Sequence, residues 1–199
     1  MLVRAPLPGR ATGGFTIIEL MVTITLLGIL FGLGLPSFTA WIRNSQIRTV
    51  SEALQNGVRT AQAEAVRRNR QVVLSFTNAT PALNATAVAN GKNWSLQTVP
   101  SLGDTAGEYL QGGALADVAS AVTITGGTTA ICFNANGRLT TNASPGAPGA
   151  SCSAATTTFN VTQPNADRNL RVIVQVGGQL RMCDPNRPTL SSTSPDGCP

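Results

Sequence analysis

The chain has 199 residues and a formal net charge of +5, and its length suits one globular domain with an appendage. Only 12% of the residues are charged, about half of the usual ~25% share, so uncharged polar residues and glycine must form much of the surface. Histidine is absent, which removes the commonest general base and the commonest metal ligand. We therefore expect no enzymatic activity, no metal and no cofactor.

An apolar stretch lies close to the N-terminus, behind a short basic leader. Residues 15–35 contain one ionisable side chain, Glu19, and as a helix rising about 1.5 Å per residue they would cross a hydrocarbon layer about 30 Å thick. The small Gly13-Gly14 pair precedes the apolar run, whereas a secretory signal is cut after its apolar run. The basic leader favours an N-terminus that stays inside the cell.

Residues 14–20 (GFTIIEL) resemble the class III signal of type IV pilins and pseudopilins. The resemblance implies that a prepilin peptidase removes the leader, residues 1–14, by cutting after Gly14, and methylates the new N-terminus at Phe15. It also implies a single-pass protein of the bacterial inner membrane with a periplasmic head. Such a protein would assemble with other pilin or pseudopilin subunits into a pilus or pseudopilus.

Glu19 lies within this apolar stretch, where an unpaired carboxylate is costly and an ionisable residue is a functional candidate. The resemblance implies a cation for it, the α-amino group on Phe15 of a neighbouring subunit, which would neutralise Glu19 and help to set the axial register. The alternative is a polar residue tolerated near a membrane interface. On the first interpretation Glu19 acts in assembly, and neither cleavage nor membrane insertion depends on it.

A second, amphipathic half of the helix is predicted beyond Pro36. Pro36 lacks an amide hydrogen and crowds the preceding turn, so we expect a kink or a local loosening there. Farther on, apolar residues recur at steps of three or four and predict a buried stripe on a helix that runs to about Asn69: Ile47, Val50, Leu54, Val58, Ala61 and Ala65. The helix is therefore predicted over residues 15–70, with residues 15–35 in the membrane.

A β-rich head is predicted over residues 71–199, where short apolar runs alternate with Gly, Asn, Pro and Thr. Two glycine pairs, 126–127 and 177–178, predict antiparallel hairpins, and residues 78–92 and 142–153 read as exposed loops. The fold class is α+β, a long N-terminal helix packed on an antiparallel β-sheet head. The predicted strands are Val72–Phe76, Trp94–Val99, Val122–Thr125, Ala130–Asn134, Thr157–Val161, Leu170–Val176 and Gln179–Cys183.

The head resembles the FimT/GspH branch of the pilin family. Residues 131–138 (ICFNANGR) are similar to the internal signature of that branch, and residues 181–185 (RMCDP) are similar to its C-terminal signature. The resemblance implies a minor type IV pilin that takes part in pilus assembly and in DNA uptake during natural transformation. The alternative is a GspH-type pseudopilin of a type II secretion system.

Four cysteines lie in the C-terminal third, at spacings unlike those of a metal or redox motif: Cys132, Cys152, Cys183 and Cys198. Three pairings are open. We favour Cys132 with Cys152 and Cys183 with Cys198, because each disulfide then closes a loop of about 20 residues or fewer at a low cost in chain entropy. The second disulfide would tie down a tail, residues 184–199, that contains little apolar material.

An arginine surplus in the C-terminal hairpin and tail is the candidate DNA contact. A two-residue turn at 177–178 would place Val174 opposite Arg181 and Arg171 opposite Asp184. With Arg171 paired in this way, three arginines would remain freer to meet phosphates: Arg168, Arg181 and Arg187.

DNA-binding relatives in this branch carry a G-R-x-R motif at the same turn. Residues 178–181 read GQLR here, so the first arginine of the motif is replaced by glutamine. No aromatic residue lies beside these arginines, so any DNA contact should be to the backbone and weakened by salt. The alternative is a solvated basic edge that discourages edge-to-edge aggregation.

Overall fold

The computed structural model describes residues 14–199, and the leader residues 1–13 lie outside the described part. The chain divides into two compact units, one that ends at Thr39 and one that runs from Ala40 to Pro199. A single helix, α1 (Ile17–Arg68), contributes residues to both units. In the first unit apolar side chains are exposed, and in the second unit they form a packed core.

In the first unit, α1 is apolar and its described side chains are exposed. Among residues 14–199, α1 is the one helix that is long and apolar enough to cross a membrane, with a mean hydropathy of 2.2 in its most apolar window. α1 stays helical through residue 36, and the kink or local loosening expected there stays a prediction.

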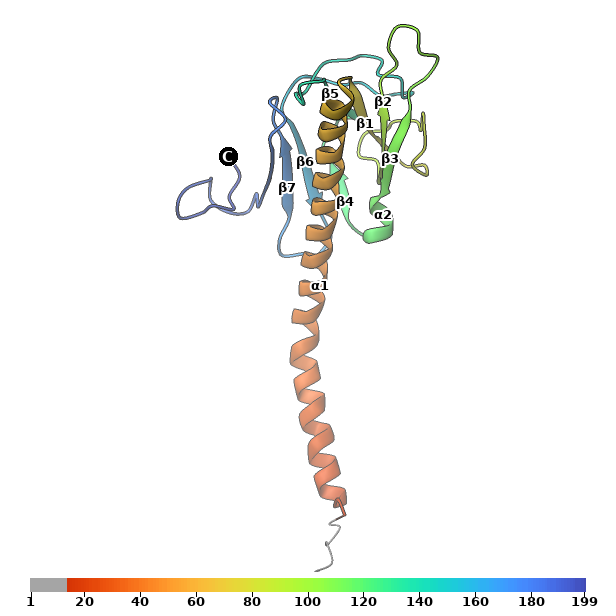
Figure 1. The fold of residues 1–199 in the computed structure, drawn as a ribbon. Coiled ribbons are helices and arrows are strands. Elements are labelled where there is room, and N and C mark those ends of the chain that lie inside the picture. Colours follow the sequence, from red (N-terminus) through yellow and green to blue (C-terminus); the bar gives the residue numbers. More distant parts are fainter. Residues whose placement is uncertain (1–13) are drawn as a thin grey trace, which may run out of the picture. The chain divides into compact units, whose positions relative to one another are not determined.

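In the second unit, α1 lies across the β-strands of the head (Figure 1). The predicted apolar stripe is confirmed, since all six of its side chains are at most 1% exposed: Ile47, Val50, Leu54, Val58, Ala61 and Ala65. These side chains form a core with residues from both sheets of the head. Burial of this stripe, rather than helix propensity alone, stabilises the second half of α1.

The first sheet has the strand order β3-β2-β1-β5, and all of its pairs are antiparallel. Its strands are β1 (Val72–Thr77), β2 (Asn93–Thr98), β3 (Tyr109–Ala114) and β5 (Ala130–Phe133). The edge strand β3 and the short helix α2 (Leu115–Val118) were not predicted. The sequence YLQGGA of β3 contains two glycines and no β-branched residue, so tertiary pairing with β2 rather than propensity makes it a strand.

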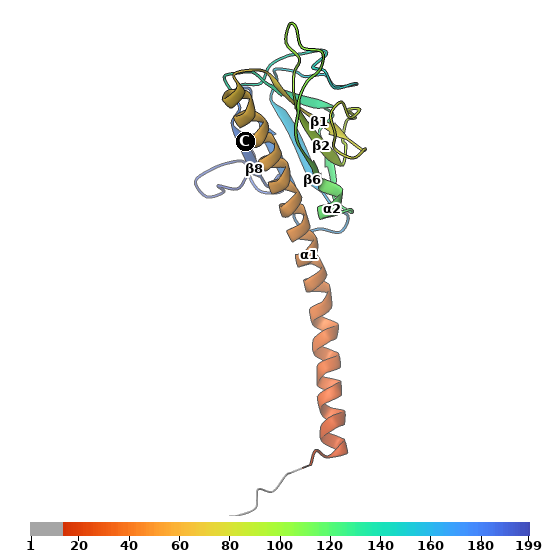
Figure 2. The ribbon, with the colours of Figure 1, turned by 45° about the vertical axis from the view of Figure 1, so that its right-hand side comes forward.

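The second sheet has the order β4-β6-β7-β8 and is also antiparallel. Its strands are β4 (Thr123–Thr125), β6 (Thr157–Thr162), β7 (Leu170–Val174) and β8 (Leu180–Cys183). Figure 2 shows β1 and β2 of the first sheet and β6 of the second to the right of α1. Phe76 of β1 and Phe159 of β6 join the sheets through ring centroids 5.1 Å apart.

The predicted hairpin at Gly126-Gly127 is wrong. β4 pairs with β6 and β5 pairs with β1, so the glycine pair carries the chain from one sheet to the other. The side-chain oxygen of Asn90 accepts hydrogen bonds from the amides of Gly126 (2.9 Å) and Gly127 (3.2 Å). Gly127 does have the positive φ (70°) that favours glycine in turns. The amides of the glycine pair, however, donate to the side chain of Asn90 instead of closing a hairpin.

The hairpin at Gly177-Gly178 is present, but its register differs by one residue from the prediction. Gln175 donates to the carbonyl of Gln179 (2.9 Å), and Gly178 has a φ of 84°. The loop is therefore three residues long with a left-handed glycine at its end, instead of a two-residue turn. Arg171 lies opposite Cys183, and not opposite Asp184 as predicted.

Two segments predicted as exposed loops contribute to a second, smaller core. Ala87 lies in the first loop, and Ala147 and Ala150 lie in the second. All three are buried together with Val73, Ala130 and the cysteine pair Cys132 and Cys152. Alanine carries too little apolar surface to stand out in a hydropathy pattern, so this core leaves no recognisable signal in the sequence.

Candidate assembly site and basic surface

The predicted processing site lies just before α1. Gly14 and Phe15 are exposed and irregular in backbone conformation, and the first helical residue is Ile17. The Phe15 side chain is 82% exposed. Within the described residues, nothing packs on the bond between Gly14 and Phe15 that a peptidase would have to displace.

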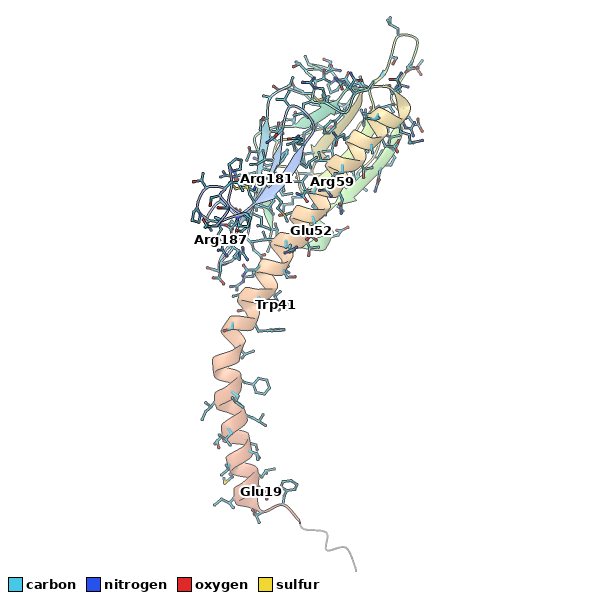
Figure 3. The ribbon with its side chains drawn as sticks, turned by 60° about the vertical axis from the view of Figure 1, so that its left-hand side comes forward. Glu19, Trp41, Glu52, Arg59, Arg181 and Arg187 are labelled. Carbon is cyan, nitrogen blue, oxygen red and sulfur yellow. A yellow bond between two sulfur atoms is a disulfide. The ribbon has the colours of Figure 1, made fainter. Side chains whose placement is uncertain are left out.

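Glu19 occupies the first turn of α1 (Figure 3). The hydroxyl of Thr16 accepts a hydrogen bond from the amide of Glu19 (3.3 Å), and the carbonyl of Thr16 accepts one from the amide of Leu20 (3.2 Å). Thr16 is thus the N-cap, with Glu19 three residues after it as in a capping box. A carboxylate at this position is also favoured by the positive end of the helix dipole.

This cap was not predicted, although its spacing, T-x-x-E, is visible in the sequence. It gives Glu19 a local structural role besides the assembly role that the resemblance implies. The two roles use different groups. The cap uses the amide of Glu19 and the side chain of Thr16, whereas the assembly role would use the Glu19 carboxylate. Among the described residues, none forms a hydrogen bond or an ion pair with the Glu19 carboxylate.

Arg168 does not lie free on the surface as predicted. It sits in the connection between β6 and β7, where its Nε donates to the buried carboxylate of Asp184 (3.2 Å) and its Nη2 donates to Asp196 (3.4 Å). Arg168 therefore takes the carboxylate that the sequence assigned to Arg171. Arg171 instead donates from Nε to the side-chain oxygen of Asn160 on β6 (2.8 Å).

The other two predicted DNA contacts also have partners in the tail. Arg181, on β8, donates from Nη2 to the carbonyl of Pro195 (3.1 Å), and Arg187 lies 3.6 Å from Asp196. Figure 3 shows Arg181 and Arg187 on this side of the head. Arg168 and Arg181 thus bind the tail from the loop before β7 and from β8, and Arg187 binds within the tail, where it shares Asp196 with Arg168.

The structure joins Cys132 with Cys152 and Cys183 with Cys198, with S–S distances of 2.09 and 2.03 Å. The first disulfide fastens the loop around residue 150 to β5. The second closes the tail onto the end of β8, where the amide of Asp184 donates to the carbonyl of Asp196 (2.8 Å). The tail is therefore held by one covalent bond and by the arginine contacts together.

A charged cluster fixes the end of α1 to the start of β3. The Glu64 carboxylate accepts hydrogen bonds from Arg67 (2.6 Å) and Arg68 (2.7 Å), and Arg68 also forms an ion pair with Glu108. These hydrogen bonds, first from Arg67 and then from Arg68, lower the pKa of Glu64 to about 2. Cations in the last turn of a helix are favoured by its dipole, and here both arginines are also engaged in ion pairs.

Two protein-family models match the chain. The model described as "Type II transport protein GspH" matches residues 50–178, and the model described as "Prokaryotic N-terminal methylation motif" matches residues 9–35. The second match contains the predicted cleavage site and Glu19. The first covers the second half of α1 and the head as far as the β7–β8 turn.

Individual relatives agree with these matches. A fimbrial protein of Pseudomonas aeruginosa is 27% identical over 119 residues, which are 52% of this chain and 76% of that protein. The type IV major alpha-pilin of Moraxella bovis is 39% identical over 75 residues, 38% of this chain and 46% of that pilin. Among solved structures, the type IV minor pilin FimU of Pseudomonas aeruginosa has a TM-score of 0.50 at 20% identity, covering 80% of this chain and 99% of that one.

A class III signal, an apolar N-terminal helix and an antiparallel β head define a type IV pilin-like prepilin. The GspH model matches well over half of the chain, and the chain belongs to the GspH family of minor pilins and pseudopilins. Members of the pilin and pseudopilin families are structural subunits. The apolar part of α1 is, in this class, the segment for membrane anchoring and for assembly.

Proposed function

We propose that this chain is a minor subunit of a bacterial type IV pilus. Its leader is removed after Gly14 by a prepilin peptidase, Phe15 becomes the methylated N-terminus, and the apolar part of α1 anchors the subunit in the inner membrane until assembly. The head then lies in the periplasm, where both disulfides are stable. The observation that carries the proposal is the exposed apolar helix with one carboxylate, Glu19, in its first turn.

A carboxylate at that place needs a cation once it leaves water. The new α-amino group at Phe15 of an adjacent subunit is a cation that cleavage itself creates, so processing and assembly would be coupled through Glu19. The names of the matched relatives support a pilus, since they are a fimbrial protein and a type IV major pilin. The description of the matching family model supports the alternative, a pseudopilin of a type II secretion system.

The test separates cleavage, assembly and the two systems. We expect Glu19→Ala to be cleaved and inserted in the membrane at the normal level, but to be lost from sheared surface filaments. Glu19→Asp, which keeps the carboxylate, is the matched variant and should retain part of the incorporation. Normal amounts of Glu19→Ala in filaments would refute the role of Glu19.

Deleting the chain distinguishes the pilus from the secretion system. On the proposal, the deletion reduces the number of surface pili and leaves the secreted proteins unchanged. Loss of secretion with normal piliation would instead identify a type II pseudopilin. Complementation with the wild-type chain must restore whichever phenotype is seen.

DNA contact stays a secondary prediction for the same head. It would use Arg168, Arg181 and Arg187, and the geometry makes it conditional, because each of these arginines already has an acceptor in the tail or at its base. A phosphate would have to displace Asp196 or to use the donors that remain. Weak, salt-sensitive binding is the form of DNA contact that this arrangement supports.

A further inference from the structure

Trp41 is exposed at the point where α1 enters the second unit. Its side chain is 64% exposed, and that of the next residue, Ile42, is 37% exposed. Ile47, five residues further on, is fully buried in the core. Figure 3 shows Trp41 on α1, nearer to the N-terminal end of the helix than Glu52 and Arg59. Trp41 therefore lies on a part of α1 that the core of the head does not cover.

The stretch of α1 that leads to Trp41 is free of charge. No ionisable side chain occurs between Glu19 and Arg43, and the 23 residues that separate them would be about 35 Å long as a helix. The hydrocarbon layer of a bilayer is about 30 Å thick, and the bilayer is about 40–45 Å thick with both headgroup layers. The two charged side chains are thus spaced to lie on opposite sides of the hydrocarbon, one in each headgroup layer.

The charge of Glu19 indicates where the hydrocarbon begins. A carboxylate without a cation is costly in hydrocarbon, and before assembly no neighbouring subunit supplies one. With Glu19 in a headgroup layer, the hydrocarbon begins at Leu20, and about 20 helical residues fill it. It then ends near residue 39, four residues beyond the end that the sequence predicted. Trp41 falls in the headgroup layer that follows.

The residue types on the two sides of Trp41 fit this position. Leu35 and Phe38, which would lie in hydrocarbon, are apolar and are 57% and 58% exposed. Tryptophan combines an apolar ring with one polar N–H group, and it is enriched where a membrane meets water. Arg43 follows, with a side chain long enough to keep its charge outside the hydrocarbon. The order along the chain is therefore the order of the layers from hydrocarbon to water.

The chain has two tryptophans, and the structure places them in opposite environments. Trp94 lies in β2 and is 5% exposed, as expected of a tryptophan that serves the core. Trp41 has most of its large apolar surface outside the core. A bilayer interface would cover that surface and leave the N–H group near water.

The connection between β6 and β7 is held at the same level of α1. Arg43 donates from Nη1 to the carbonyl of Asn165 (3.1 Å), and the side-chain oxygen of Asn44 accepts hydrogen bonds from the amides of Asp167 (3.2 Å) and Arg168 (3.1 Å). These contacts begin two residues after the tryptophan. Asp167 and Arg168 are exposed and carry one charge of each sign, so this connection can face hydrated headgroups without a net charge.

We propose that Trp41 of the unassembled subunit lies in the phospholipid headgroup layer of the periplasmic leaflet, with residues 20–39 in the hydrocarbon. The partner of this surface is the bilayer itself. The inference rests on the membrane anchoring in the proposed function and adds to it the depth of the chain in the membrane. It also makes the β6–β7 connection the part of the head that lies at the membrane surface.

Fluorescence quenching measures the depth of a tryptophan in a bilayer. The full-length chain is reconstituted at a low protein-to-lipid ratio in phosphatidylcholine vesicles, whose lipids are brominated either near the headgroup or near the end of the acyl chain. Bromine quenches a tryptophan that lies close to it. In Trp94→Phe, which keeps Trp41 alone, we expect quenching by the headgroup-proximal bromine to exceed quenching by the chain-end bromine roughly twofold or more.

Two variants calibrate this measurement. Trp41→Phe keeps only the buried Trp94, which should be quenched by neither lipid. Ile29→Trp, in a chain whose two native tryptophans are replaced by phenylalanine, puts the probe at an exposed position in the middle of the proposed span. It should show the opposite order of quenching. Resistance of the head to trypsin shows that each variant is folded.

Cross-linking identifies what covers position 41 and leaves Trp94 unchanged. The photo-cross-linker p-benzoylphenylalanine replaces Trp41 in the full-length chain, and isolated inner membranes are irradiated and digested with trypsin. We expect a phospholipid adduct on the peptide that ends at Arg43, detected by mass spectrometry. The cross-linker at Thr49, which is exposed on α1 and about 12 Å further along the helix, should give no lipid adduct.

Equal quenching by the two lipids, stronger quenching by the chain-end bromine or no quenching of Trp41 would overturn the inference. A protein adduct in place of the lipid adduct at position 41, or an equal lipid adduct at Thr49, would also contradict it. If the chain floats with the vesicles and Trp41 is not quenched, the interface contact fails while the anchoring stands. A chain that does not float with the vesicles would remove the anchoring that the proposed function requires, and the inference with it.

Discussion

The indole ring of Trp94 occupies the space in which a side chain at Gly57 would lie. A Cβ added to Gly57 would be 2.8 Å from Cε2 of Trp94, closer than carbon atoms pack. Gly57 is in the buried half of α1 and Trp94 is in β2, so this contact sets how closely the helix approaches the first sheet. Gly113 of β3 meets the same ring, with a hypothetical Cβ 2.6 Å from it.

Gly57→Ala should therefore destabilise the head, although alanine is the better helix former. The gain in helix propensity is about 0.5–1 kcal/mol, whereas overpacking a tight contact costs about 1–3 kcal/mol. We expect a net loss of about 1–2 kcal/mol in the free energy of unfolding. Chemical denaturation of the full-length chain in detergent measures it.

The partner of the same contact supplies the control. Trp94→Phe alone should destabilise the head, because it removes buried aromatic surface. In the double variant, however, the smaller ring should make room for the methyl group added at position 57, so that Gly57→Ala costs less than in the wild type. Strict additivity of the two substitutions would show that the ring does not limit the helix position.

The cluster around Glu64 predicts a loss of stability in acid. The hydrogen bonds from Arg67 and Arg68 lower the folded pKa of Glu64 from 4.5 to about 2, so its contribution is fully present above about pH 4.5 and is lost as the pH falls through 2. The full linkage would be about 3 kcal/mol. Because the cluster lies near the surface, solvent screening reduces this to about 1 kcal/mol.

Glu64→Gln tests that contribution. The variant should be less stable than the wild type at pH 6 by about 1 kcal/mol, and the difference should shrink towards pH 2. The measurement is the free energy of unfolding of both proteins across this pH range. A difference that stays constant with pH would mean that the carboxylate charge of Glu64 does not contribute.

The disulfide between Cys183 and Cys198 should determine whether the tail is ordered. Replacing both cysteines by serine removes a cross-link that closes a loop of 15 residues, worth about 3 kcal/mol in the chain-entropy account. We expect rapid proteolysis after residue 184, with the remainder of the head resistant. The equivalent change at Cys132 and Cys152 should leave the tail protected, and equal cleavage of the tail in both variants would contradict its separate anchoring.

The extent of the helix and most strands could be predicted because each has a local signal. The stripe from Ile47 to Ala65 has the helical period, and β1 and β7 have continuous runs of β-formers such as Val72-Val73 and Leu170–Val174. β3 has no such signal, because its glycines at 112 and 113 are required by the closeness of Pro81 and Trp94. That requirement comes from tertiary packing and is invisible in a single sequence.

The arginine contacts show why the basic surface was harder to predict. A difference of one residue in the β7–β8 loop changes which side chains face each other, since side chains alternate along a strand. With Arg171 opposite Cys183, its guanidinium bonds to Asn160, and Asp184 is left for Arg168. The composition of the surface was correct, but the pairing of its charges depended on a left-handed residue at Gly178.

The predicted DNA contact can be tested through Asp196, whose carboxylate would compete with phosphate for Arg168 and Arg187. The soluble part of the wild-type chain, residues 43–199, should bind duplex DNA weakly at about 50 mM salt and lose most of this binding by about 200 mM. Arg181→Gln and Arg187→Gln should each reduce the affinity and the salt slope.

Asp196→Asn is the informative variant, because Asp196 holds both Arg168 and Arg187. Removing its charge releases Arg187 and one of the two contacts of Arg168, which still donates to Asp184, so the affinity for DNA should rise if phosphate binds there. Glu52→Gln adds the same unit of positive charge at Arg48 on α1, outside the tail, and controls for bulk electrostatics. We expect Asp196→Asn to bind more tightly than Glu52→Gln, in an electrophoretic or fluorescence titration at low salt. Equal gains in the two variants would assign the binding to net charge, and no binding by any of these proteins would leave the arginines with the tail as their sole role.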